Sequence, residues 1–91
     1  MIEYEWDEEK RLYNLNRRGL DFNDAWRVYE AEDKITLKSP YPHEERWMDM
    51  AEINGRVMVL VYTMRGNAVR CISFRYAKRG RERSLYYEQD R

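Results

Sequence analysis

Arginine and lysine side chains gather in the last third of the chain, where they could bind a phosphate. Between Asn54 and Ser84 the only acidic residue is Glu82. The basic residues of this segment are Arg56, Arg65, Arg70, Arg75, Lys78, Arg79, Arg81 and Arg83. A guanidinium offers paired donors to a phosphate, whereas an ammonium acts as a point charge. This segment can therefore attract a polyanion; the alternative is a solvated face that pairs with acidic residues elsewhere in the chain.

The neutral total charge hides an asymmetry between the two halves of the chain. The 91 residues include 17 basic and 17 acidic side chains. Residues 1–50 carry 13 acidic and 8 basic side chains, whereas residues 51–91 carry 4 acidic and 9 basic side chains. We expect the acidic half to lie away from a bound polyanion.

Arg65 precedes the predicted strand "AVRCISFRYA", and Arg75 stands near its end. Strict alternation predicts one face with Val69, Cys71, Ser73 and Arg75 and the opposite face with Arg70, Ile72, Phe74 and Tyr76. Arg65 precedes the strand, so an extended chain would place it about 30 Å from Arg75. That separation favours an extended ligand, such as RNA or a partner chain, over a small one. Arg75, next to the cluster from Lys78 to Arg83, could bind a phosphate with paired donors. The alternative for Arg75 is an ion pair with a glutamate or aspartate at the strand end.

The sequence contains no recognised catalytic motif. The one histidine, His43, has no second histidine or cysteine at metal-ligand spacing, so we expect no metal site and a solvated loop residue there. There is no Ser/His/Asp arrangement, glycine-rich phosphate loop or helix-turn-helix signature. RNA carries its own nucleophile, the 2′-hydroxyl, so arginine and lysine could promote cleavage by positioning and charge. The candidates for the proton acceptor and donor are Glu82, Tyr86, Lys10 and His43.

The elements that must position these side chains begin with a strand and two helices. "IEYEW" alternates apolar and polar residues, and Asp7 can cap a helix from about Glu8 to Arg18 that stops at Gly19. The apolar stripe of this helix would consist of Leu12, Leu15 and Tyr13. Asp21 can cap a second helix over residues 22–30.

Strands dominate the rest of the chain. A short strand over "KITLK" is halted by Pro40 and Pro42. Asn54-Gly55 separates "ERWMDMAEI" from "RVMVLVYT" and predicts a tight hairpin, and "MRGN" predicts a second turn. A last helix begins at about Arg81. We expect one α+β domain over residues 1–91, with helices on one face of an antiparallel sheet of three to four strands.

Cysteine usage and hydropathy indicate the compartment. Cys71 is the single cysteine, so no internal disulfide can form and a reducing environment is expected. The longest apolar run, from Val57 to Tyr62, is far shorter than the roughly 20 residues of a membrane span, and the acidic start is unlike a signal peptide. We therefore expect a cytoplasmic protein.

Two long segments resemble the BrnT-type toxins of bacterial type II toxin–antitoxin systems. The first, "EWDEEKRLYNLNRRGLDFNDAWRVY", resembles the opening W-D-x-x-K-x-x-x-N-x-x-K-H-G-x-x-F-x-x-A. It matches at Trp6, Asp7, Lys10, Asn14, Gly19, Phe22, Ala25 and Val28. The second, "GRVMVLVYTMRGNAVRCISFRYAKRGRERSLY", is similar to G-R-x-x-x-V-x-Y-T-x-R-x-x-x-x-R-x-I-S-x-R-x-A followed by E-R-x-x-Y. It matches at Gly55, Arg56, Tyr62, Thr63, Arg65, Arg70, Ile72, Ser73, Arg75, Ala77, Glu82, Arg83 and Tyr86.

The resemblance implies a RelE-like α+β fold and a ribonuclease that arrests translation without a metal or cofactor. It also implies a cognate antitoxin with a ribbon-helix-helix part, through which the complex would bind DNA indirectly. The stoichiometry of such a complex, 1:1 or 2:2, stays open. The alternative is a catalytically weak or inactive module that uses the same basic face to hold an antitoxin or RNA.

The resemblance also assigns roles to individual residues. The implied catalytic residues are Lys10, Arg65, Arg75 and Glu82, where Glu82 is either a proton carrier or an ion-pair partner of Arg75 or Arg83. The implied RNA-binding residues are Arg70, Lys78, Arg79, Arg83 and Tyr86. Roles in the fold are expected for Trp6, Asn14 and Phe22. The chain departs from the motif at Arg18, where relatives carry histidine, and at Tyr76, where they commonly carry a basic residue.

Overall fold

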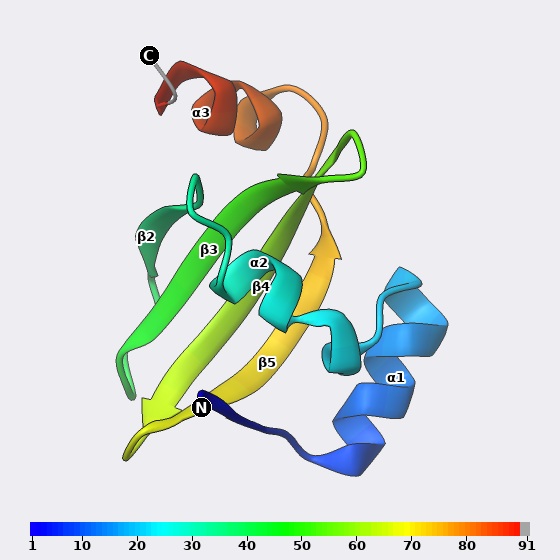
Figure 1. Cartoon of the computed structure of the whole chain (residues 1–91), viewed down its shortest axis with the longest axis vertical. Coiled ribbons are helices and arrows are strands. Elements are labelled where there is room, and N and C mark those ends of the chain that lie inside the picture. Colours follow the sequence, from blue (N-terminus) through cyan, green and yellow to red (C-terminus); the bar gives the residue numbers. More distant parts are fainter. Residues whose placement is uncertain (90–91) are drawn as a thin grey trace.

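A five-stranded sheet forms the centre of the structure, a computed structural model that describes residues 1–89 (Figure 1). The elements in chain order are β1 (Glu3–Glu5), α1 (Glu8–Arg18), the 3-10 turn η1 (Phe22–Asp24), α2 (Trp26–Tyr29), β2 (Ile35–Ser39), β3 (Arg46–Ile53), β4 (Arg56–Arg65), β5 (Ala68–Tyr76) and α3 (Arg81–Gln89). The strand order is β1-β5-β4-β3-β2. The expected α+β class is confirmed, but β1 adds a fifth strand that pairs parallel to β5, so the sheet is mixed.

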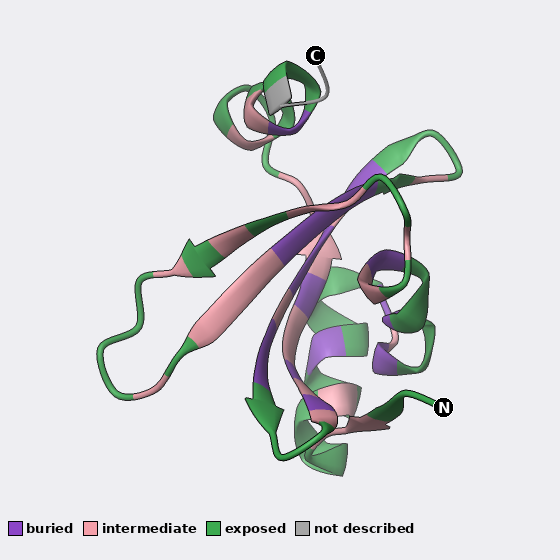
Figure 2. Ribbon diagram, turned by 60° about the vertical axis from the view of Figure 1, so that its left-hand side comes forward, coloured by how far each residue is buried: buried purple, intermediate pink, exposed green. Residues whose placement is uncertain are grey.

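The helices cover both faces of the sheet. On one face, Leu60 belongs to an apolar cluster with Phe22 of η1 and Val28 of α2. On the other face, Val59 clusters with Tyr86 of α3. The expectation that all helices share one face is therefore wrong for α3. Figure 2 shows buried residues along the central strands and on parts of the helices.

Strand β5 contains a bulge at Ile72. Ser73 and Cys71 pair with consecutive residues of β4, so Ile72, which lies between them, has no partner there. An extra residue of this kind reverses the alternation of side chains along the rest of a strand. Ser73 and Arg75 therefore share a face with Arg70, and the prediction that they share a face with Cys71 is wrong.

Helix α1 has the predicted ends but not the predicted buried face. The Asp7 carboxylate accepts hydrogen bonds from the first turn, and Gly19 ends the helix with φ 78°. The three side chains that were expected to form a packed stripe are exposed: Leu12 by 52%, Tyr13 by 56% and Leu15 by 38%. Asn14 is the buried residue of α1. The expected stripe is wrong because this helix meets the edge of β5, where main-chain polar groups need partners.

Two shorter predictions have mixed outcomes. The helix expected over residues 22–30 is split into η1 and the four-residue α2, although Asp21 caps η1 as expected. The predicted hairpin turn is confirmed, since Asn54 and Gly55 have φ values of 52° and 82°. Among residues 1–89, no helix is long and apolar enough to cross a membrane.

Candidate functional site

Asn14 attaches α1 to the edge of β5. Its Nδ2 donates to the Phe74 carbonyl at 2.7 Å, and its Oδ1 accepts from the Phe74 N–H at 3.1 Å. The same Nδ2 donates to the Leu20 carbonyl at 2.9 Å. The side-chain amide thus satisfies main-chain groups that a neighbouring strand would otherwise satisfy. The expectation of a buried, satisfied amide at Asn14 is confirmed.

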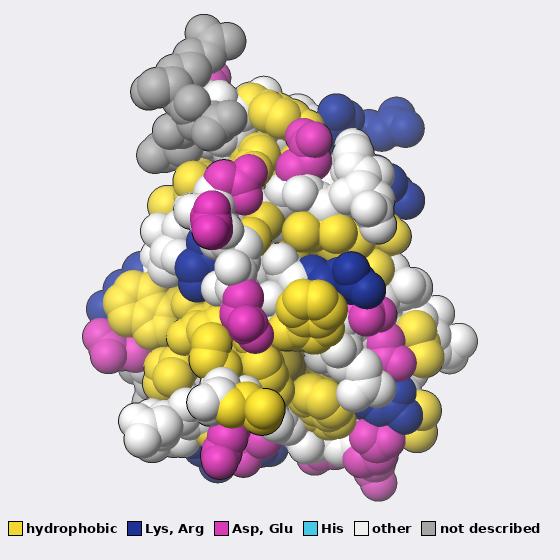
Figure 3. All heavy atoms as spheres, viewed as in Figure 1, with side chains coloured by type: hydrophobic (Ala, Val, Ile, Leu, Met, Phe, Trp, Pro, Cys, Tyr) yellow, Lys and Arg dark blue, Asp and Glu magenta, His cyan; other side chains and the backbone are white. Residues whose placement is uncertain are grey.

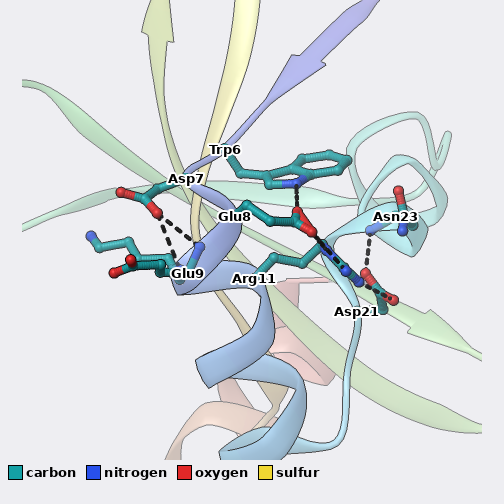
Figure 4. A network of polar contacts seen from close by, with 8 residues as sticks. Trp6, Asp7, Glu8, Glu9, Arg11, Asp21 and Asn23 are labelled. Carbon is teal, nitrogen blue, oxygen red and sulfur yellow. Dashed lines mark hydrogen bonds and ion pairs between the residues drawn. The ribbon is translucent and has the colours of Figure 1, made fainter.

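An ion-pair network fixes the first turns of α1 (Figure 4). The Arg11 guanidinium lies 2.8 Å from a Glu8 carboxylate oxygen and 2.9 Å from an Asp21 carboxylate oxygen. The hydrogen bond from Arg11 lowers the pKa of Glu8, and the main-chain N–H of Asn23 is the chief cause that lowers the pKa of Asp21. The network holds α1 against the loop that follows it. Helix α1 therefore has a fixed position beside β5.

A groove of about 520 Å³ lies between α1 and β5. We call it the α1–β5 groove, and its lining residues are Lys10, Tyr13, Asn14, Arg17, Arg18, Ile72 and Ser73. Three of these are cations from a single helix, and Ser73 reaches the groove because of the bulge. Tyr13 is an exposed aromatic side chain, and the Arg17 guanidinium lies 5.3 Å from its ring centroid. Cations beside an aromatic ring are the groups that bind phosphates and bases.

A smaller pocket of about 240 Å³ adjoins this groove and contains Arg65 and Arg70, the two arginines nearest the β4–β5 turn. We call it the hairpin pocket; it is lined by Asp7, Lys10, Glu44, Arg46, Thr63, Arg65, Arg70, Cys71 and Ile72. Lys10 and Ile72 line both cavities, so the two basic cavities are adjacent. Arg70 lies 3.7 Å from a Glu5 carboxylate oxygen. Within the described part of the chain, Lys10 and Arg65 form no ion pair, so their charges face solvent.

Arg75 lies at the other end of β5, beneath α3. Its two terminal nitrogens donate to the two carboxylate oxygens of Glu82 at 2.7 and 3.0 Å, and the Lys78 N–H donates to the same carboxylate at 2.8 Å. These bonds lower the pKa of Glu82, and the hydrogen bond from Arg75 has the largest effect. Arg75 pairs with Val59, six residues before Arg65 on β4, so the two arginines are separated by about 20 Å along the strands. The bulge and the pairing register shorten the expected 30 Å.

The remaining predicted RNA-binding residues are not gathered around the groove. Arg79 and Arg83 line a separate pocket of about 250 Å³ with Arg56, whose guanidinium stacks 3.5 Å from the Tyr76 ring centroid. Lys78 is exposed beside α3. Tyr86 is 3% exposed and packs on the sheet, so its burial argues against a direct contact with RNA.

Two expectations about other surfaces can be compared with the structure. His43 is exposed in the loop before β3, as expected, with its ring 5.3 Å from that of Tyr41. On the face shown in Figure 3, which carries α2, acidic side chains are interspersed with basic and apolar side chains. Five of the seven residues that line the α1–β5 groove belong to residues 1–50, so a polyanion in this groove would contact that half of the chain, contrary to the expectation that the acidic half lies away from it.

Residues 6–80 match the family model of BrnT, the ribonuclease toxin of type II toxin–antitoxin systems. The chain belongs to the BrnT family. No curated protein matches the chain. Membership of the BrnT family makes the chain a relative of ribonuclease toxins and implies an antitoxin partner. The matched residues contain the whole lining of the α1–β5 groove but end before Glu82.

The groove collects BrnT motif positions from both ends of the chain. Six of its seven lining residues, all except Tyr13, stand at positions that the two motifs specify. Of these, only Lys10 was singled out as catalytic from the sequence. Tyr13 and Arg17 were not among the predicted site residues, and Arg18 was noted only as a departure from the motif. Spacings of three and four residues place Lys10, Tyr13 and Arg17 on one side of a helix, and this spacing is the signal that could have found Tyr13 and Arg17.

Proposed function

We propose that the chain is an endoribonuclease that cleaves RNA without a metal ion and thereby inhibits translation. The observation that carries the proposal is the basic α1–β5 groove, in which BrnT motif positions from two distant segments meet. Its cations and the adjoining arginines of the hairpin pocket have the charge that a phosphodiester backbone requires. Since both cavities share Lys10, an extended strand can follow one path across them.

In the proposed reaction the RNA supplies the nucleophile. The 2′-oxygen attacks the adjacent phosphorus as its proton leaves, the P–O5′ bond breaks, and the O5′ oxygen takes up a proton. The products are a 2′,3′-cyclic phosphate and a 5′-hydroxyl, so no oxidant or co-reactant is needed. Lys10 and Arg65 stabilise the negative charge that develops on the phosphorane, and Arg70 binds a neighbouring phosphate.

Arg75 and Glu82 enter the proposal as a pair that positions α3 and the end of β5. Both donor nitrogens that face Glu82 are engaged, and the side chains are 15% and 18% exposed. The lowered pKa of Glu82 keeps it ionised at neutral pH, which suits an ion-pair partner better than a proton donor. Of the four candidates for proton transfer, Lys10 is the one that lines both cavities.

The proposed partner is a small ribbon-helix-helix antitoxin. Its inhibitory segment would carry acidic residues onto the basic surface formed by the two cavities, where it competes with RNA. The complex would bind DNA only through the antitoxin, in the cytoplasm, with a stoichiometry of either 1:1 or 2:2. Lys78, Arg79 and Arg83 supply a second basic region for a longer RNA or for the partner.

The test is cleavage of single-stranded RNA by the purified protein, with and without a chelator. We expect cleavage in both conditions and a loss on the order of 10²-fold in rate for Lys10→Ala and Arg65→Ala. Lys38→Ala is the matched control, since it removes an exposed cation of β2 that lies in neither basic cavity. Intact RNA at a large excess of enzyme contradicts the proposal, and inhibition by chelator contradicts the metal-free mechanism.

One observation favours the alternative of an inactive binding module. The lining of the α1–β5 groove, as far as the structure describes it, includes no carboxylate or imidazole. An inactive module binds RNA with a strong salt dependence but shows no turnover. The same cleavage assay separates the two functions, because salt-dependent binding without product formation supports the module.

A further inference from the structure

We infer that Tyr13 is a stacking platform for an unpaired RNA base, so that the α1–β5 groove selects single-stranded RNA. This inference rests on the proposed function and adds a residue that lies outside the BrnT motif. Tyr13 lines the groove, yet 56% of its surface is exposed. A large aromatic ring left open beside a cavity offers a flat apolar face on which a base can stack.

Two cations beside Tyr13 supply the charges that such a site needs for the phosphates. The Arg17 guanidinium lies 5.3 Å from the ring centroid, and Lys10 stands three residues before Tyr13 on the same side of α1. The stripe from Lys10 to Arg17 covers about 10 Å of helix at about 1.5 Å per residue. A base stacked on Tyr13 would thus have a cation for its phosphates on either side along the helix.

The opposite wall completes the binding site. Ser73 faces α1 across the groove because the bulge at Ile72 turns it toward that side. Its hydroxyl can donate to and accept from a nucleotide. Arg18, beside Arg17, adds a further donor group to the lining. The aromatic face, the cations and the hydroxyl are the groups that single-stranded nucleic-acid sites combine.

Paired bases cannot use such a platform. In an RNA duplex the faces of the bases are stacked on one another, so Tyr13 could be reached only by a base that has left the helix. The cations bind phosphates of either form. Tyr13 therefore discriminates between single-stranded and double-stranded RNA, whereas the neighbouring cations provide affinity for both.

The test measures binding separately from cleavage. A fluorescein-labelled 2′-O-methyl RNA oligonucleotide lacks the nucleophile, so its anisotropy reports affinity whether or not the protein is an active enzyme. We expect Tyr13→Ala to weaken single-strand binding by about 5- to 100-fold, as for one stacked base, and Tyr13→Phe to stay within about twofold of the wild type. The salt dependence should not change for Tyr13→Ala but should weaken for Arg17→Ala.

Two control variants exclude general effects of surface truncation. Leu12→Ala removes a side chain of similar exposure from the same helix but outside the groove, and Trp26→Ala removes another exposed aromatic ring with an arginine, Arg27, stacked on it. Both should bind as the wild type does. Wild-type affinity in Tyr13→Ala, or equal wild-type affinity for a pre-annealed duplex, overturns the inference. Binding that depends on Tyr13 without any cleavage of ordinary RNA supports the inference and contradicts only the proposed function.

Discussion

Two parallel hydrogen bonds join the Arg75 guanidinium on β5 to the Glu82 carboxylate on α3. The fork-to-fork geometry is the strongest that this type of ion pair adopts, and both side chains are largely shielded from solvent. Tyr86, one turn further along α3, packs against the apolar face of the sheet. The ion pair and this tyrosine together hold α3 against the strands, which assigns both charged residues a role in the fold.

A double-mutant cycle should show that Arg75 and Glu82 act as one unit. We expect Arg75→Met and Glu82→Gln each to lower the free energy of unfolding by about 1–2 kcal/mol, because each removes the charge-assisted bonds that join the two side chains. The double variant should lose clearly less than the sum of the two. Urea denaturation measures all four proteins. Strictly additive losses would contradict the coupling that the geometry implies.

The same ion pair predicts how stability depends on pH. The Glu82 pKa is lowered from its ordinary value of 4.5, chiefly by Arg75, so the folded state favours the ionised carboxylate. The resulting stabilisation is complete above about pH 4.5 and is lost as the pH falls through the lower folded-state pKa. The difference in unfolding free energy between wild type and Glu82→Gln should therefore shrink between pH 6 and pH 3. A difference that stays constant over this interval would argue against the ion pair.

The link between Asn14 and Phe74 should be essential for the position of α1. Asn14→Ala removes three hydrogen bonds and leaves the buried main-chain groups of Phe74 without these partners, so we expect a loss of about 2–4 kcal/mol in the free energy of unfolding. Amide exchange at Phe74 should also become faster. Asn16→Ala, an exposed position on the same helix, should be neutral or slightly stabilising. Equal stability of the two variants would refute the role of Asn14.

Local patterns predicted the elements of this fold better than the partners of individual side chains. The caps Asp7 and Gly19 and the turn at Asn54-Gly55 depend on nearby residues, so their sequence signals sufficed. The pairing of β1 with β5 joins segments more than 60 residues apart and has no local signal. The bulge at Ile72 also has no local sequence signal, because one extra residue hardly changes the composition of a strand.

The candidate site was predicted in part for the same reason. The family motif selected Lys10, Arg65 and Arg70, which the structure brings into one pocket. The ion pair between Arg75 and Glu82, one of the two roles expected for Glu82, is confirmed, but its two-bond geometry could not be foreseen because it depends on where α3 docks. Buried polar contacts are hidden in the same way: Asp49 is fully buried, and Lys34 and Thr36 donate hydrogen bonds to it.

The single cysteine should be unreactive in the folded protein. Burial alone raises the pKa of the Cys71 thiol to about 12, and the side chain is 2% exposed. We therefore expect no labelling by iodoacetamide at pH 8 in buffer and stoichiometric labelling in 6 M guanidinium chloride, measured by mass spectrometry. Rapid labelling under native conditions would show that β5 opens readily at this point.

Arg18 offers a direct test of charge in the α1–β5 groove, because it stands where the motif that the chain resembles has histidine. Arginine stays charged at all ordinary pH values, whereas histidine loses its charge near pH 6.5. Arg18→His should therefore bind 2′-O-methyl RNA as tightly as wild type at pH 5.5 but about 3- to 10-fold more weakly at pH 7.5. Arg18→Lys should show no such change. If Arg18→His binds equally well at both pH values, residue 18 does not contact the phosphate backbone.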